Sequence, residues 1–99
     1  MTETWKHTHH PLYEVSNLGR VRSYAMRGAK GQYAYPHVLV TTVDTRGYLQ
    51  VRVAGQQWRV HRLVAAAFIG PCSKGQEVMH RDDVRTNCAL DNLLYGTRS

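Results

Sequence analysis

The sequence predicts an α+β fold, a small antiparallel β meander with one short helix. Residues 48–53 alternate between apolar and polar side chains, which is typical of a half-buried strand. The spacing of apolar residues then becomes helical over residues 61–68, so that these side chains share one face of a helix. A chain of 99 residues is long enough for one small domain and too short for two.

Five short strands are expected from β-branched or alternating runs separated by turn residues: residues 12–15, 21–24, 38–43, 48–53 and 56–60. The polar N-terminus before the first strand is expected to be loosely ordered apart from Trp5. Residues 26–35 are rich in Gly, Ala and Tyr and predict a loop. Gly70 and Pro71 end the predicted helix, and residues 77–99 are polar and turn-rich.

The charge balance indicates a polyanionic partner. Thirteen Lys and Arg against seven Asp and Glu give a formal net charge of +6. Ten of the thirteen cations are Arg, whose guanidinium group makes bidentate contacts with phosphates and base edges. Nucleic acid is therefore the expected partner, and a basic surface that serves only solubility is the alternative.

The same sequence excludes several other classes of protein. No apolar run approaches the roughly 20 residues of a membrane-spanning helix, so no membrane partner is expected. The N-terminus lacks the apolar core of a signal peptide, which argues against a secreted protein. Cys72 and Cys88 are too few for a disulfide framework, and reduced thiols in the cytoplasm are expected.

Two adjoining segments carry recognisable motifs. The first is LYEVSNLGRVRS at residues 12–23, and the second begins with VHRLVAAAF at residues 60–68. The second continues through HRDD at residues 80–83, then Asn87, then the triplet DNL and finally a Gly-Thr pair. The first segment resembles the NUMOD4 motif, and the second resembles the HNH domain, of phage- and intron-encoded HNH homing endonucleases.

This resemblance covers nearly the whole chain and implies a division within one compact unit. Residues 1–56 would form the N-terminal, NUMOD4-like DNA-binding β region, and residues 57–99 would form the HNH nuclease region. Double-stranded DNA is then the implied partner. The resemblance to phage enzymes also implies the cytoplasm of a phage-infected bacterial host.

The resemblance implies metal-dependent hydrolysis of a DNA phosphodiester. In the family, a ββα motif (the His-Me finger) holds one divalent cation, Mg²⁺ or Mn²⁺, and a His activates the attacking water. His80 occupies the position of that general base. Asn92 is expected to hold the two strands of the motif in register, and Asn87 to cap the loop between them. Asp82 is a candidate metal ligand, with hydrogen bonding to its own turn as the alternative role.

Arginines near the predicted strands are the candidate DNA contacts. Arg20 and Arg22 alternate with Val21 and are expected to share one strand face, where they can track phosphates or read a groove. A solvated sheet face is the alternative, and Trp5 is expected to lie in the core rather than to stack on bases. The full set of candidate DNA-binding residues is Arg20, Arg22, Arg52, Arg59, Arg62 and Arg81.

Four departures from the family pattern favour an alternative function, a DNA-binding module or accessory subunit without catalysis. Asp83 replaces the family's Gly, at a turn where Asp tolerates a left-handed backbone. Cys88 replaces the second Asn, and Met79 stands where some relatives carry an Asp that ligates the metal. A thioether is a poor ligand for Mg²⁺. The last ligand of the signature would fall about two residues beyond Ser99, so the ββα motif is expected to be incomplete.

Pairing with a second copy of the chain, as a homo-oligomer that completes the site, is a third alternative.

Overall fold

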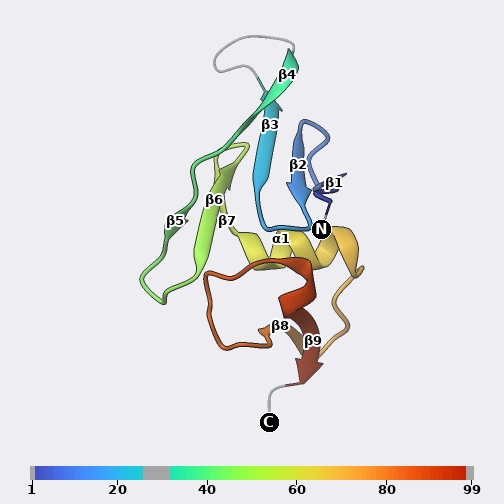
Figure 1. Cartoon of the computed structure of the whole chain (residues 1–99), viewed down its shortest axis with the longest axis vertical. Helices are drawn as coiled ribbons and strands as arrows, with labels where there is room; N and C mark the ends of the chain where they lie inside the picture. Colours follow the sequence, from blue (N-terminus) through green and yellow to red (C-terminus); the bar gives the residue numbers. More distant parts are fainter. Residues whose placement is uncertain (1, 26–31, 98–99) are drawn as a thin grey trace.

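The computed structural model describes residues 2–25 and 32–97, in which one helix lies between three small antiparallel sheets (Figure 1). The helix α1, Val60–Phe68, crosses the middle of the molecule, with β1–β3 on one side and β8–β9 on the other. The elements in chain order are β1 (Trp5–His7), β2 (Tyr13–Ser16), β3 (Val21–Ala25), β4 (Gln32–Val38), β5 (Thr42–Val43), β6 (Leu49–Val53), β7 (Gln56–Arg59), α1, β8 (Gln76–His80), the 3-10 helix η1 (Leu90–Asn92) and β9 (Leu93–Thr97). The α+β prediction is confirmed.

The first sheet has the order β1-β2-β3-β4 and contains a strand that the sequence did not predict. Residues Trp5–His7 pair with β2, with Trp5 opposite Ser16, although this polar segment was expected to be loosely ordered. The expectation was wrong because backbone pairing with β2 orders the segment, whatever the polarity of its side chains.

The chain between β3 and β5 also differs from the prediction. The expected strand at residues 38–43 is divided, since Val38 ends β4 in the first sheet and Thr42 begins β5 in the second. The side chain of Val40 between them is 87% exposed, so no buried face holds the run in one strand. Of the expected loop at residues 26–35, residues 26–31 lie outside the described part, and the rest belongs to β4 because it pairs with β3.

The second sheet has the order β5-β6-β7 and confirms the alternation seen in the sequence. Val51 and Val53 of β6 are buried, whereas Arg52 between them is exposed. The strand β6 pairs with β7 from Gln50 opposite Arg59 to Val53 opposite Gln56. The chain therefore reaches α1 directly from β7, with Arg59 as the residue before the helix.

The core is built around α1, which contacts elements of all three sheets. Its inward face buries Leu63, Val64 and Ala65 against valines of β2, β3 and β6. The backbone N–H of Gly70, at a φ of 119°, donates to the carbonyl of Ala65 and closes the helix end. Within the described residues, no helix is long and apolar enough to cross a membrane.

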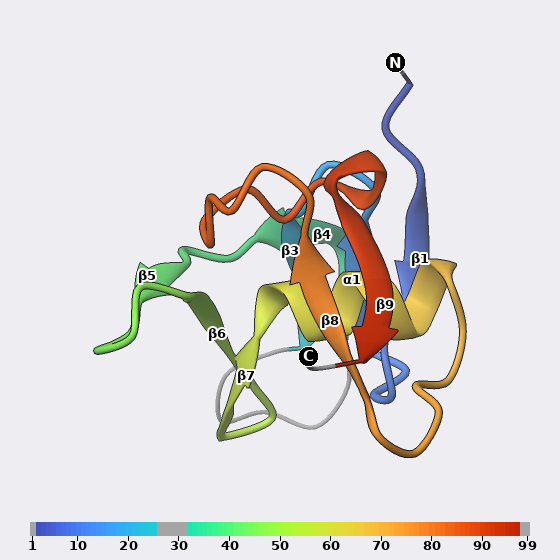
Figure 2. The ribbon, with the colours of Figure 1, turned by 90° about the horizontal axis from the view of Figure 1, so that it is seen from below.

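The C-terminal part is a two-stranded hairpin that packs on the same helix (Figure 2). The strands β8 and β9 pair from Gln76 opposite Thr97 to His80 opposite Leu93. Composition alone described this region as polar and turn-rich, and only the family resemblance implied its two strands. The hairpin places His80 at the end of β8, where the long loop to η1 begins.

The turn between β2 and β3 joins the N-terminal sheet to this hairpin loop. The buried hydroxyl of Ser16 accepts hydrogen bonds from the backbone N–H groups of Leu18, at 3.2 Å, and of Arg20, at 3.1 Å. The backbone carbonyl of Asn17 accepts a hydrogen bond from the N–H of Leu90 at 2.8 Å. The two motif-bearing parts of the chain are thus in direct backbone contact.

Candidate functional site

The loop after His80 is closed by one buried amide, that of Asn92. Its Oδ1 accepts a hydrogen bond from the backbone N–H of Asp82 at 3.2 Å. Its Nδ2 donates to Asp82 Oδ1 and to the carbonyl of Asn87, both at 2.9 Å. The backbone N–H of Arg81 also donates to the Asn92 carbonyl at 2.8 Å. These contacts are of the kind expected of an organising residue, and the role of Asn92 in the site stays a prediction.

Asp82 takes part in the same network through both carboxylate oxygens. Oδ1 also accepts the backbone N–H of Val84 at 2.9 Å, and Oδ2 accepts Asn87 Nδ2 at 2.8 Å. The hydrogen bonds from Asn87, Val84 and Asn92 lower the pKa of Asp82. These contacts match the turn-binding role that was weighed against ligation. Asp83 adopts a φ of 60°, which confirms the left-handed backbone expected at the position of the family's Gly.

His80 lies in a cluster of rings with Tyr48 and His61. The ring centroids of His61 and His80 are 4.9 Å apart, and those of Tyr48 and His61 are 5.0 Å apart in a stacked arrangement. Tyr48 in turn lies under two guanidinium groups, Arg59 at 4.4 Å and Arg85 at 4.9 Å from its ring centroid. The hairpin, the strand-helix junction and the turn before β6 each contribute to this cluster.

Burial and charge favour the neutral form of both imidazoles. Burial, acting together with the neighbouring His80 and Arg62, lowers the pKa of His61 to about 4. Burial also lowers the pKa of His80, with Arg85 acting in the same direction and Asp82 opposing it. Both side chains are therefore able to accept a proton or a hydrogen bond at neutral pH.

A groove of about 760 Å³ lies beside this cluster and is strongly basic. Tyr48 and His61 line it together with four arginines, whereas Glu77 is the only carboxylate among the described lining residues. The four are Arg46, Arg59, Arg62 and Arg85. Such a concentration of guanidinium groups around a concave surface suits a phosphodiester backbone.

Two of these arginines were expected from the sequence and two were missed. Arg59 and Arg62 were candidates, and Arg59 donates from Nε to Asp44 Oδ2 at 3.2 Å. Arg46 and Arg85 come from two loops far apart in sequence, and the Arg85 guanidinium donates to the carbonyl of Arg46. Neither residue lies on a predicted strand. The one sequence signal for Arg85 was its position inside the HNH-like segment, and Arg46 had none.

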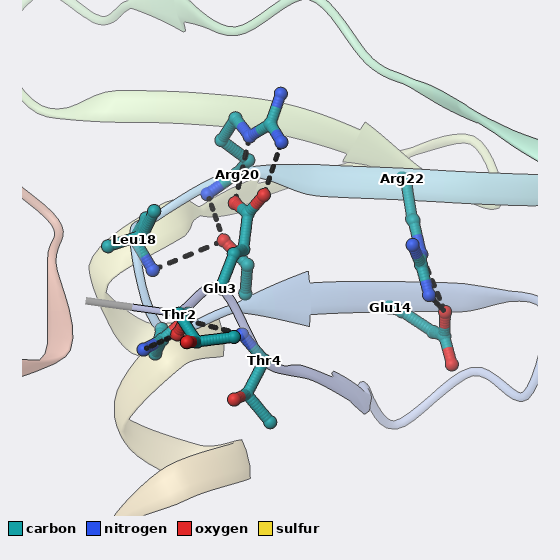
Figure 3. Close-up of polar contacts among 9 residues, drawn as sticks. Thr2, Glu3, Thr4, Glu14, Leu18, Arg20 and Arg22 are labelled. Carbon is teal, nitrogen blue, oxygen red and sulfur yellow. Dashed lines mark hydrogen bonds and ion pairs between the residues drawn. The ribbon is translucent and has the colours of Figure 1, made fainter.

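Arg20 and Arg22 lie elsewhere, on the N-terminal sheet, and are both ion-paired (Figure 3). Arg20 Nε donates to Glu3 at 2.8 Å, which lowers the pKa of the Glu3 carboxyl, and Arg22 pairs with Glu14 at 2.7 Å. Their guanidinium groups lie over the ring of Trp5 at 5.5 and 4.1 Å from its centroid. The structure therefore shows these two arginines bracing β1 and its neighbours.

The two remaining candidates, Arg52 and Arg81, are exposed. Arg52 lies on the outer face of β6, and Arg81 follows His80 in the hairpin loop. Neither lines the basic groove. The six candidate arginines thus do not form one surface, and the structure groups only Arg59 and Arg62 beside the His cluster.

The described residues do not fit a complete site for a divalent cation. Residues 2–25 and 32–97 contain no group of three or more His, Cys, Asp or Glu arranged to hold a metal ion. The carboxylate of Asp82 is already engaged by three hydrogen-bond donors, and Met79 presents a thioether. The dependence on Mg²⁺ or Mn²⁺ implied by the resemblance stays a prediction.

Cys88, which replaces an Asn of the family pattern, has become part of the core. It is 3% exposed, and burial raises its thiol pKa to about 11. Cys72 is exposed, and both cysteines are free, as expected. The backbone of Cys88 lies so close to the turn before β3 that a Cβ on Gly19 would be 3.0 Å from its carbonyl carbon.

Comparison with known proteins identifies both halves of this arrangement. Residues 3–54 match the NUMOD4 motif, and residues 59–99 match an HNH endonuclease family. A structure concerning DNA binding and cleavage by the HNH homing endonuclease I-HmuI is similar, with a TM-score of 0.69 and 30% sequence identity. The match covers 95% of this chain and 52% of that chain, so the present chain spans about half the length of its relative. No curated protein matches the chain.

Proposed function

Because this chain belongs to the family of HNH endonucleases that carry a NUMOD4 motif, we propose that it binds double-stranded DNA and hydrolyses a phosphodiester bond. One observation carries the proposal. His80, held at the end of β8 by the Asn92 network, lies at tilted ring contacts with Tyr48 and His61, which line a groove with four arginines. A base thus stands beside a surface suited to phosphates.

DNA binding is assigned to the groove rather than to the N-terminal sheet. Among the described residues, Arg46 and Arg62 form no ion pair, so their charges are available to phosphate oxygens. Each phosphate neutralised releases condensed counterions, which makes the affinity fall as salt rises. Arg20 and Arg22 contribute less, because Glu3 and Glu14 already neutralise them.

His80 serves as the general base. Its Nε2 is buried, so Nδ1 is the nitrogen that remains to take a proton from a water. The water oxygen then bonds to phosphorus, the bond from phosphorus to the leaving oxygen breaks, and that oxygen takes a proton from solvent. The lowered pKa of His80 supports this role, since the neutral imidazole predominates at neutral pH.

A supercoiled-plasmid nicking assay tests the proposal. The protein is incubated with Mg²⁺ or Mn²⁺, beside a His80→Ala variant and an EDTA control. We expect nicking that depends on the metal and falls at least about 100-fold in the variant, the usual contribution of a general base. Nicking that His80→Ala leaves unchanged would contradict the assigned role of His80.

A DNA-binding module without catalysis is the second candidate function. The absence of a three-ligand metal cluster among the described residues favours it, as does Met79 beside His80. Salt-sensitive binding of the same plasmid, without strand breakage in either metal, would support this candidate against the first.

A further inference from the structure

Two buried imidazole nitrogens near the groove have no hydrogen-bond partner among the described residues. They are Nδ1 of His61 and Nε2 of His80. A buried polar atom left unpaired is costly, so native structures almost always supply it with a partner. The two unpaired atoms belong to rings in contact with each other.

We propose that His61 is a positioning residue for His80, whose Nε2–H it accepts in a hydrogen bond at its own Nδ1. The consequence for catalysis rests on the proposed function, in which His80 is the general base. The pairing itself concerns only the free protein.

The separation of the rings fits such a bond. In an N–H···N hydrogen bond of about 2.9 Å, the centres of two imidazole rings lie roughly 5 Å apart. The centroids of His61 and His80 are 4.9 Å apart, with an angle of 54° between the rings. A rotation of either ring about χ2, a broad and soft torsion, would align the donor and acceptor.

His61 is suited to the role of acceptor. Its side chain is 3% exposed, in the first turn of α1, and it is held there against the stacked ring of Tyr48. An acceptor nitrogen must be unprotonated, and burial together with the nearby arginines keeps His61 neutral at pH 7.

The side chains in ring or cation–π contact with the cluster leave few alternatives. The guanidinium groups of Arg59 and Arg85 carry only donors, so neither can accept the N–H of His80. The hydroxyl of Tyr48 is able to accept, but the Tyr48 ring centroid is 6.0 Å from that of His80, farther than that of His61. Removal of this hydroxyl alone therefore makes a matched control.

The bond would set the tautomer of the general base. When Nε2 of His80 carries the proton, Nδ1 presents its lone pair, and the ring is held in one orientation. Without His61, both tautomers become populated and the ring is free to turn. His61 thus acts on the reaction through His80.

Nitrogen-15 NMR of the full chain tests the pairing without any cleavage. In the wild type at pH 7.5, we expect a single Nε2–H tautomer of His80 and a measurable scalar coupling from this nitrogen to Nδ1 of His61. In His61→Leu, both tautomers should appear, whereas His61→Asn, whose amide oxygen can replace Nδ1, should restore the single tautomer. Tyr48→Phe should leave it unchanged.

Two results would overturn the proposal. One is a wild-type spectrum in which Nδ1 of His80 carries the proton. The other is loss of the single tautomer in Tyr48→Phe but not in His61→Leu. A wild-type coupling observed together with absent nicking would preserve the pairing and reject the proposed nuclease function, so the two failures are distinguishable. If the Leu variant fails to fold, the wild-type coupling and the Asn variant still decide.

Discussion

At the scale of single residues, the loop around His80 depends on one buried amide. Asn92 is 7% exposed and makes three hydrogen bonds across the loop. Asn87, by contrast, is exposed and bonds mainly to the outer oxygen of Asp82. Removal of the Asn92 amide would therefore leave buried backbone groups unpaired, whereas removal of the Asn87 amide would leave an exposed carboxylate oxygen that water can reach.

The variant Asn92→Ala should destabilise the fold by about 2–3 kcal/mol, because it leaves the backbone N–H of Asp82 and the carbonyl of Asn87 without partners. Asn87→Ala should cost about 1 kcal/mol or less, since solvent can replace its bonds. Urea unfolding at pH 7 measures both changes. Equal losses in the two variants would contradict the central role of Asn92.

The buried His61 should make stability depend on pH. In the unfolded chain its imidazole takes up a proton near pH 6.5, but in the folded protein only near pH 4. Between these values the unfolded state binds more protons, so the free energy of unfolding falls as pH falls. The contribution lost between pH 7 and pH 5 is about 2 kcal/mol.

Urea unfolding at pH 7 and pH 5 measures this loss, with His61→Leu as the control. The difference in the free energy of unfolding between pH 7 and pH 5 should be smaller in the variant, which has no imidazole at position 61 to protonate. Carboxyls with lowered pKa, such as Asp82, titrate below this window and do not disturb the comparison. An unchanged difference would show that His61 does not titrate as described.

At the scale of elements, the turn between β2 and β3 connects the N-terminal sheet to the hairpin loop. Gly19 adopts a φ of +87° and approaches the backbone of Cys88. Gly55, in the turn between β6 and β7, has the same φ of +87° with nothing within 4 Å of the position of a Cβ. Substituting each of these two glycines therefore separates the free-energy cost of the backbone conformation from the cost of a steric contact.

Gly55→Ala should destabilise the protein by about 1–2 kcal/mol, the cost of a left-handed backbone alone. Gly19→Ala should cost about 1–3 kcal/mol more, because its methyl group would be 3.0–3.1 Å from three atoms of Cys88. Thermal unfolding of both variants checks the difference. Equal shifts in Tm would mean that the turn at Gly19 and the loop at Cys88 can move apart at little cost in free energy.

At the scale of the whole molecule, the arginines divide into a group on the N-terminal sheet and a group around the groove. Those on the N-terminal sheet are paired with Glu3 and Glu14. Those in the groove come from loops, from the end of β7 and from α1. Arg59 pairs with Asp44, and Glu77 is the one carboxylate among the described lining residues. The net charge of +6 therefore understates how basic the groove is.

Arg62→Gln should weaken DNA binding and reduce the slope of log affinity against log salt by about 1, as expected for one lost phosphate contact. Arg52→Gln removes the same charge from an exposed strand face outside the groove and should change the slope less. Fluorescence anisotropy with a labelled duplex at several salt concentrations measures both. A larger change in the slope for Arg52→Gln than for Arg62→Gln would indicate that DNA binds at β6 and not in the groove.

The sequence by itself determined the elements whose signal is local. The alternation in β6 and the helical spacing of α1 predicted those elements to within a residue or two, because each depends on neighbours along the chain. The motif spacing likewise singled out Asn92 and Asp83, whose roles are set inside one loop. The family resemblance predicted the β8–β9 hairpin, whose polar composition alone did not indicate strands.

Only the tertiary structure decided which distant residues meet. The ordering of β1, the division of residues 38–43 between two sheets and the contact of Gly19 with Cys88 all depend on partners far along the chain. The same holds for the groove, where Arg46 and Arg85 join across 39 positions of sequence. Local patterns report which face of an element is apolar, whereas a binding surface depends on how separate elements pack, and no short window of sequence contains that information.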